Sequence, residues 1–429
     1  MATIHFTNQD YASGHLVDTP EPGAVVWQSP ALAGPLQFDL AAVNSIRFPV
    51  AAAPPQAPGD YRFELAGGDL LFGSLVALAD DEAVIEVRGL GPLHVERSSL
   101  RRIVRRQGSE LVFAGPTGLD GWQVLPGAQA WREDAGQLLT KTRQAVLRRD
   151  FAAPAQASFE IELSWRDQAD FDLALGVAAD PKSLLRAFHI EAWSGQLVVQ
   201  RETEREADVA AIQELKPGPG RLSLRVFLDQ PAGRILVCAP SGRLLADLQV
   251  TTSKPQTLGG IQLTNRAAGD IRLENLRISR WDGRPPLPAD AQKARVYQTD
   301  GTILYGELQR FDPAERQFVV AAENSSQSFD EAAVREVFFA AQENTEPSAL
   351  AVVYQSGARL SGSLLKVEDQ KVWIACPGIR EPLAVPIESL RSLIVLGDHF
   401  GLIVSGEKQG RQGRLVSDGL LLHGWLDPG

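Results

Sequence analysis

The chain has 429 residues, of which 44% are hydrophobic and 22% are charged, and its formal net charge is −11. This length suggests about three domains rather than one, and the composition excludes long disordered stretches. The acidity argues against a general nucleic-acid binder, because phosphate binding depends on lysine and arginine. The sequence has no run of about 18 apolar residues, so we expect no transmembrane helix.

The N-terminus and the cysteines bear on the cellular compartment. Residues Met1 to Asn8 lack a basic stretch followed by an apolar core, so they do not form a signal peptide. The location stays open: the protein is cytoplasmic, or a leader was removed and an extracellular or cell-envelope location is favoured. Cys238 and Cys376 fall in different predicted domains. We therefore expect two buried thiols on strands rather than a disulfide.

The first two segments of the chain, 1–52 and 58–110, are predicted to be copies of one small β repeat. The signature is a pair of glycines five residues apart, as in Gly68-Asp-Leu-Leu-Phe-Gly73, followed by several short strands. Repeat 1 carries a weaker form, with Gln9 in place of the first glycine. The same spacing returns late in the chain, in repeat 3 (292–342), repeat 4 (348–398) and an incomplete fifth copy (410–429) that holds only the opening hairpin.

The repeat pattern predicts five short strands that bend into a small barrel. The first glycine is placed in a hairpin turn that needs a positive φ. The second lies inside a strand, where a missing side chain permits sharp coiling or a bulge. A unit of about 50 residues is small for a core of its own, so we expect neighbouring repeats to pack in pairs.

The incomplete fifth copy needs a partner, because a lone two-stranded hairpin is marginal in water. Three explanations are open. The chain has been shortened, the hairpin docks on another barrel such as the first, or it donates a strand to a second molecule and so mediates self-association.

The repeats resemble SH3-like and Sm-like small barrels. The opening of repeat 4, Gly357-Ala-Arg-Leu-Ser-Gly362-Ser-Leu, is similar to the first half of an Sm motif, but the Arg-Gly signature of the second half is absent. The resemblance therefore implies a fold and not RNA binding. A basic cluster in repeat 2 is interpreted as a solvated strand edge or a pairing surface for nearby acids; it comprises Arg97, Arg101, Arg102, Arg105 and Arg106.

Residues 112–283 show long strands that alternate apolar and polar side chains, which predicts a two-sheet sandwich. Phe159-Glu-Ile-Glu-Leu-Ser-Trp165 is one example. With Gly121-Trp122, Gly136-Gln-Leu-Leu-Thr and Leu276-Arg-Ile-Ser-Arg-Trp281-Asp-Gly, the segment resembles the concanavalin A-like jelly roll of bacterial laminin-G-like and 3-keto-disaccharide hydrolase-like domains. The resemblance implies a superfamily of sugar binders, glycosidases and modules without a known ligand. The predicted fold class is all-β, a jelly-roll sandwich flanked by paired SH3-like barrels.

Paired carboxylates are the candidates for catalysis, because glycoside hydrolysis needs two carboxyl groups flanking the scissile bond. Glu160 and Glu162 share one face of a strand, and Asp170 and Asp172 form a second pair. Phe159, Ile161 and Leu163 alternate with these glutamates and are expected to point inward, so the alternation explains the outward-facing glutamates without chemistry. The Glu-x-Asp-x-x-Glu signature of jelly-roll glucanases is absent. No catalytic residue is therefore assigned.

Three tryptophans of the central segment are candidate platforms for sugar rings, since aromatic faces bury C–H surfaces well; these are Trp131, Trp165 and Trp193. Packing in the sandwich core is the competing interpretation. His189 lies in an alternating strand and is interpreted as a structural histidine.

A calcium site built from loop carboxylates is the one cofactor considered, with Asp167, Asp170 and Asp180 as candidate ligands. The predicted function is non-catalytic: binding of a glycan or protein ligand, or scaffolding, through the sandwich or the barrel edges. Glycoside hydrolysis is the alternative hypothesis. Oligonucleotide binding by the barrels is the third, and the acidity of the chain disfavours it.

Overall fold

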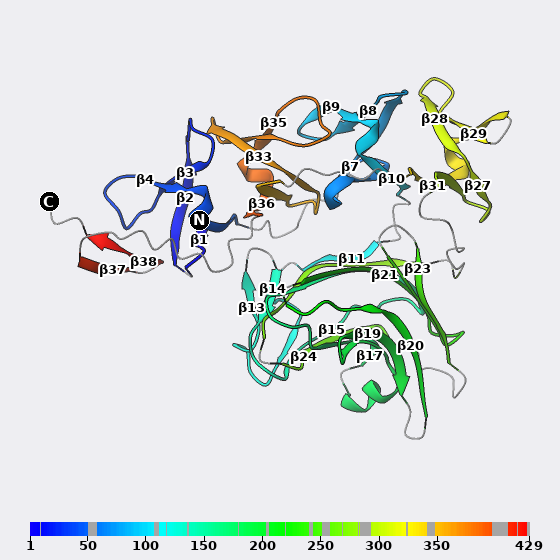
Figure 1. Cartoon of the computed structure of the whole chain (residues 1–429), viewed down its shortest axis with the longest axis horizontal. Coiled ribbons are helices and arrows are strands. Elements are labelled where there is room, and N and C mark those ends of the chain that lie inside the picture. Colours follow the sequence, from blue (N-terminus) through cyan, green and yellow to red (C-terminus); the bar gives the residue numbers. More distant parts are fainter. Residues whose placement is uncertain are drawn as a thin grey trace. The chain divides into compact units, whose positions relative to one another are not determined.

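The computed structural model describes residues 1–8, 10–49, 58–106, 111–116, 118–134, 137–178, 180–202, 206–218, 220–239, 243–250, 258–267, 269–281, 283, 293–322, 325–340, 348–396, 411–417 and 419–426. In these residues the regular structure consists of β-strands and short 3-10 turns, which confirms the all-β class. No helix long and apolar enough to cross a membrane occurs in the described part of the chain. Two compact units are present, one formed by 1–106 with 292–429 and the other by 107–291 (Figure 1).

The first unit contains the four repeats and the terminal hairpin. Repeat 1 has β1 (Ala2–Phe6), β2 (Tyr11–Val17), β3 (Ala24–Gln28), β4 (Leu36–Asp39) and β5 (Val43–Arg47). Repeat 2 has β6 (Tyr61–Leu65), β7 (Leu70–Leu78), β8 (Glu82–Val87), β9 (Gly91–Glu96) and β10 (Leu100–Arg105), with η2 (Ala66–Gly68) in its first turn.

Repeats 3 and 4 contain the corresponding strands. In repeat 3 the second strand is divided, giving β26 (Arg295–Gln298), β27 (Ile303–Tyr305), β28 (Glu307–Asp312), β29 (Gln317–Ala322), β30 (Ser325–Asp330) and β31 (Val334–Phe338). Repeat 4 has β32 (Leu350–Tyr354), β33 (Arg359–Glu368), β34 (Lys371–Ala375), β35 (Leu383–Pro386) and β36 (Leu390–Val395). The terminal hairpin is β37 (Arg411–Ser417) and β38 (Leu420–Leu426).

One strand order recurs in all four repeats. In repeat 1, β1 pairs with both β2 and β5, and β2, β3 and β4 follow as an antiparallel meander. Repeats 2, 3 and 4 show the same pairings. A 3-10 turn precedes each fifth strand: η1 (Leu40–Ala42), η3 (Arg97–Ser99), η6 (Glu331–Ala333) and η7 (Ile387–Ser389). The same sequence pattern thus builds the same local structure four times.

In repeats 2 and 4 both glycines of the signature take the predicted roles. The first glycines have positive φ, for example +83° at Gly68 and +86° at Gly357. At the second glycines a Cβ would lie within 3.0 Å of a backbone carbonyl on the third strand, Glu86 for Gly73 and Ala375 for Gly362. The missing side chain therefore lets the second strand approach the third closely.

The repeats join through two kinds of strand contact. In the last-strand junction, fifth strands pair antiparallel: β5 with β36, and β10 with β31. In the second-strand junction, second strands pair at one or two positions: Leu70 with Arg359, and Tyr11 with Leu421. The order along the unit is therefore repeat 3, repeat 2, repeat 4, repeat 1 and terminal hairpin.

The expected packing of neighbouring repeats is wrong. Among the described residues, each strand pairing between repeats joins one copy from before the sandwich to one from after it. The entropic cost of closing a loop grows only slowly with its length, so a partner far away in the sequence costs little more than a near one. The match between strand edges therefore decides which repeats pair. The terminal hairpin lies on repeat 1, which was one of the open expectations.

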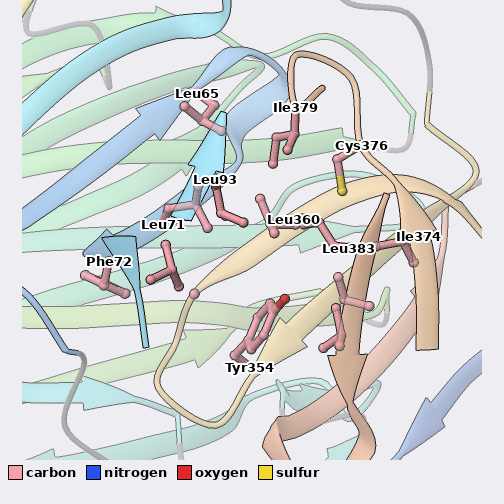
Figure 2. Close-up of a cluster of buried hydrophobic side chains, with 14 of the residues drawn as sticks. Leu65, Leu71, Phe72, Leu93, Tyr354, Leu360, Ile374, Cys376, Ile379 and Leu383 are labelled. Atoms are coloured by element: carbon pink, nitrogen blue, oxygen red, sulfur yellow. The ribbon is translucent and has the colours of Figure 1, made fainter. Parts of the chain in front are cut away.

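Apolar side chains from all four repeats form one continuous core. Figure 2 shows its part at the junction of repeats 2 and 4, where Leu71 and Leu93 of repeat 2 lie near Leu360 of repeat 4. Cys376 is buried in the same cluster, and Cys238 is buried in the other unit; both are free thiols, as expected.

The basic cluster of repeat 2 lies largely in the contact with repeat 3. Arg102 is only 1% exposed, and its guanidinium lies 2.8 Å from Glu336 and 2.9 Å from Glu64. Arg105 donates to the carbonyl of Ala332, and Arg97 donates to that of Gln309. For Arg102 the interpretation as a surface that pairs with nearby acids is confirmed.

The second unit is a sandwich of two antiparallel sheets. The eight-stranded sheet contains, in order, β13 (Arg132–Asp134), β14 (Gln137–Thr140), β25 (Ile271–Arg280), β16 (Gln156–Trp165), β21 (Gly220–Asp229), β22 (Arg234–Cys238) and β23 (Leu244–Gln249), with β11 (Leu111–Gly115) beside β25. The seven-stranded sheet contains β12 (Gln123–Leu125), β15 (Ala145–Asp150), β24 (Gly260–Asn265), β17 (Phe171–Val177), β18 (Phe188–Trp193), β19 (Gln196–Glu202) and β20 (Ala207–Glu214).

The main core of the sandwich lies between the sheets and uses the alternation seen in the sequence. On β16, Phe159, Ile161 and Leu163 are buried in this core. The first and last strands of the sandwich, β11 and β25, pair antiparallel with each other, so the start and the end of this unit lie side by side. This arrangement is typical of a domain inserted into another fold.

Candidate binding face on the sandwich

The three candidate tryptophans have different environments. Trp131 and Trp165 are 1% and 6% exposed and belong to the core between the sheets. A buried ring offers no face to a ligand, so their assignment as sugar platforms is corrected to core packing. Trp193 is 56% exposed and keeps an accessible indole.

The position of Trp193 follows from the alternation of β18. Phe188 and Ile190 of this strand point into the core, so His189, Glu191 and Trp193 point to the outer side. The strand ends in a tight hairpin in which Ser194 and Gly195 have φ of 50° and 81°. Two consecutive positive φ values are those of a type I′ turn, which holds Trp193 at the tip of the sheet.

A charged cluster lies beside Trp193 on the same outer side. Asp172 of β17 is directly opposite Glu191 of β18, an arrangement that is unfavourable for like charges unless cations compensate. Arg266 supplies one cation: it contacts Asp172 at 3.5 Å and forms an ion pair with Glu191. His189 supplies the other, with Nδ1 lying 2.8 Å from Asp172.

The environment changes the pKa of two members of this cluster. Burial lowers the pKa of His189, but the hydrogen bond and charge of Asp172 and the carbonyl of Leu184 raise it, and the net shift is upward. Burial raises the pKa of the Glu191 carboxyl, and Arg266 opposes this shift only in part. A carboxyl group with such a shift beside specific charge partners is typical of functional sites.

A short segment covers part of this outer side. The 3-10 turn η5 (Pro181–Arg186) places Leu184 against a small apolar cluster with Ala174 and Ala187. His189 Nε2 lies 2.9 Å from the carbonyl of Leu184, and Arg201 donates to that of Arg186. Both ring nitrogens of His189 therefore face acceptors, which favours the doubly protonated imidazolium.

The polar network continues across the sheet. Arg148 of β15 donates to the side-chain oxygen of Gln262 of β24 at 2.8 Å, and Gln262 donates to Thr264 at 3.1 Å. Gln200 of β19 donates to Glu191. The outer side of the seven-stranded sheet thus carries a row of hydrogen-bonded polar groups at low exposure.

The outer sides of the two sheets differ in character. On the eight-stranded sheet, the Arg221 guanidinium lies 2.6 Å from Glu162 and 2.8 Å from Glu274, which makes a surface ladder of charges. The large hydrophobic side chains exposed on the described sandwich are Leu125, Leu185, Trp193 and Val209. These four lie on the outer side of the seven-stranded sheet or on the turn that covers it. This side is therefore the better candidate for ligand binding.

The predicted carboxylate pair and calcium ligands are not brought together into a site. Glu160 and Glu162 lie on the eight-stranded sheet, on the side away from Trp193, and Glu162 is paired with Arg221. Asp167 and Asp180 are exposed and Asp170 is half-buried. No group of three or more histidine, cysteine, aspartate or glutamate residues able to hold a metal ion occurs in the described part of the chain.

The sequence interpretation missed Glu191 and Arg266. For Glu191 a signal was available: the period of two in Phe188-His-Ile-Glu-Ala-Trp193 places His189, Glu191 and Trp193 on one side of a strand. For Arg266 no signal was available, because it lies in a loop after β24 and reaches the cluster only through the fold.

Comparisons with known proteins add distant likenesses to solved structures. No family model matches the chain, and no curated protein matches it. Similar solved structures include the carbohydrate-binding module CBM66 from Bacillus subtilis (12% identity, 37% of this chain and 95% of that chain, TM-score 0.28). A second is the Emp46p carbohydrate recognition domain (10% identity, 40% of this chain and 98% of that chain, TM-score 0.28). A third is the VIP36 exoplasmic/lumenal domain (7% identity, 41% of this chain and 93% of that chain, TM-score 0.31). At these identities and TM-scores the likenesses decide nothing about function.

Proposed function

We propose that the sandwich binds a glycan on the outer side of its seven-stranded sheet, with Trp193 as the platform for a sugar ring. The observation that carries this proposal is the exposed indole of Trp193 beside the fixed polar groups of Glu191 and Arg266. An aromatic face with a few oriented polar groups is the usual composition of a small-ligand site.

The test is binding of the full chain to a broad glycan array, followed by affinity electrophoresis on the glycans that bind. Trp193→Ala is expected to weaken binding by about 10-fold or more, because the apolar contact with the ring is lost. Tyr305→Ala is the matched control, since Tyr305 is an exposed aromatic residue in repeat 3. Equal affinities of the wild type and Trp193→Ala, or silence on the array, contradict the proposal.

Glycoside hydrolysis is a second candidate, supported by one observation. Asp172 and Glu191 are a cross-strand pair of carboxyl groups, and burial raises the pKa of Glu191 as a general acid requires. Glu191→Gln is then expected to abolish sugar release from a polysaccharide panel. Glu162→Gln on the opposite sheet is the control and keeps full activity. A wild type that binds a glycan without cleaving it excludes this candidate.

We propose further that the repeats are SH3-like barrels with the limits 1–52, 58–110, 292–342 and 348–398, that 112–283 is a concanavalin A-like jelly roll, and that 410–429 is a docking hairpin. The shared strand order of the repeats and the two-sheet arrangement of the sandwich support this division. In this proposal the repeats are a scaffold from which the sandwich is presented.

A further inference from the structure

The junctions of the first unit connect two parts of the chain that are separated by the sandwich. We call residues 1–106 the N-terminal half and residues 293–426 the C-terminal half. Repeat 2 pairs with repeat 3 and contacts repeat 4, and repeat 1 pairs with repeat 4 and with the terminal hairpin. No strand pairing among the described residues joins two repeats of the same half.

The junction of repeats 2 and 3 contains buried charge. Arg102 lies 2.8 Å from Glu336, a pair with side chains only 1% and 8% exposed, and Tyr61 donates to Glu331 at 2.5 Å. Beside this pair, β10 and β31 continue one sheet, with Ile103 opposite Val337. Each half thus supplies one member of each buried polar pair.

The junction of repeats 2 and 4 has an apolar core that includes a buried carboxyl group. Asp69 accepts the backbone N–H of Ser361 at 2.7 Å. The backbone N–H of Glu96 donates to the carbonyl of Gly378 at 2.7 Å, and that of Arg380 donates to the carbonyl of His94 at 3.0 Å. The side chains around these bonds form the core seen in Figure 2.

Repeat 1 is held by the C-terminal half on two sides. On one side β5 pairs with β36, and the backbone N–H of Phe48 donates to the carbonyl of Arg391. On the other side Asp10 accepts the backbone N–H of His423 at 2.6 Å. The contact of Asp10 is equivalent to that of Asp69, because each aspartate follows the first signature position and each donor precedes a second glycine.

We propose that the two halves are binding partners of each other, and that the sandwich segment acts as a tether between them. The strand edges that residues 1–106 would expose on their own are the ones covered by the C-terminal half, so that half is the partner that fits them. The contacts between the halves are non-covalent strand pairings and core packing that do not involve the sandwich, so we expect the two halves to stay bound after the tether is cut. Exchange of halves between two copies is then a form of domain swapping. This inference is independent of the glycan proposal.

The test uses the folded full chain with one protease recognition sequence inserted between 107 and 110 and another between 284 and 291. After cleavage at both sites, the N-terminal and C-terminal fragments are expected to elute together and to give a 1:1 complex in native mass spectrometry. Fragments that separate under native conditions overturn the proposal.

A variant at a buried junction measures what holds the complex together. Arg102→Ala is expected to raise the dissociation constant of the cut halves by roughly 100-fold or more, because it removes the buried ion pair with Glu336 across the junction. Lys366→Ala is the control, since the ion pair of Lys366 with Glu368 lies within repeat 4. If Arg102→Ala prevents folding of the full chain, Arg102→Lys is measured in its place. An unchanged dissociation constant contradicts the proposal.

Discussion

At the scale of single residues, His189 makes the stability of the sandwich depend on pH. Its pKa is raised in the folded protein, so the folded state binds the proton more tightly than the unfolded state does. The stabilisation is complete below the unfolded pKa of about 6.5 and is lost as the pH rises through the raised value. Thermal unfolding from pH 5 to pH 9 should show this loss in the wild type and not in His189→Asn.

The control for this pH dependence is His94→Asn. His94 also lies near a carboxylate, with Nδ1 3.3 Å from Glu82, but its side chain is 39% exposed. We expect this variant to keep the pH profile of the wild type. A wild-type profile that does not change between pH 6 and pH 9 contradicts the assignment to His189.

Asp69 is a buried carboxyl group whose charge is unfavourable. Burial raises its pKa, and the hydrogen bond from Ser361 opposes the shift only in part. Its contribution to stability is therefore present below the unfolded pKa and lost as the pH rises above it. Asp69→Asn keeps an acceptor for the N–H of Ser361 and removes the charge, so we expect a more stable protein at pH 7 and no gain near pH 3.

The comparison with Asp69→Leu separates the hydrogen bond from the charge. This variant removes the acceptor and leaves the N–H of Ser361 buried without a partner, which costs about 1–3 kcal/mol. Urea unfolding at pH 7 should therefore give the order Asn, Asp and Leu from most to least stable. An Asn variant less stable than the wild type would show that the charge is not the unfavourable part.

Residue-scale inference from the sequence succeeded where a period of two decides the answer. It placed Glu162 on an outer surface and His189 on a strand, and both placements hold. It did not separate Trp193 from Trp131 and Trp165, because exposure depends on which side of which sheet faces the core. That assignment requires the pairing of strands far apart in the sequence.

At the scale of elements, the two signature glycines are needed for different reasons. The second lies too close to a neighbouring strand for a side chain, and the first has a positive φ. A Cβ on Gly362 would overlap the carbonyl of Ala375, whereas a Cβ on Gly357 meets nothing within 4 Å and faces only the strain of a positive φ. We expect Gly362→Ala to destabilise the protein by about 3 kcal/mol or more and Gly357→Ala by about 1 kcal/mol. Equal losses in urea unfolding would refute this division of roles.

The elements themselves were largely predictable. Alternation predicted the β-strands, and the ends of the short strands follow from turn residues with positive φ such as Gly68 and Gly357. The break between β27 and β28 was not foreseen, because a divided strand leaves the glycine spacing unchanged.

At the scale of the whole molecule, sequence order misled the assignment of partners. The spacing of the signatures favoured repeats 1 and 2 as one pair, whereas the structure joins repeat 1 to repeat 4 and repeat 2 to repeat 3. A junction is selected by two matching edges that are remote in sequence. Such a match is visible only when the edge residues of all copies are compared after their strands are known.

The end of the array at repeat 3 follows from that comparison. At the second-strand junction, Leu65 and Leu93 of repeat 2 and the equivalent Tyr354 and Leu383 of repeat 4 are all buried in one core. In repeat 3 the equivalent positions are Gln298 and Gln327, and Gln327 is exposed. Polar residues at the open end of a repeat array prevent further stacking.

Restoring the apolar residues should therefore extend the array to a second molecule. Gln298→Leu with Gln327→Leu is expected to produce a concentration-dependent dimer in sedimentation velocity, because the new edge of repeat 3 matches the junction used by repeats 2 and 4. Arg310→Leu with Glu315→Leu adds the same two leucines at exposed positions of repeat 3 and should leave the sedimentation coefficient unchanged. A dimer from both double variants would mean that added hydrophobicity alone causes association. A monomer from the first would mean that the two glutamines do not terminate the array.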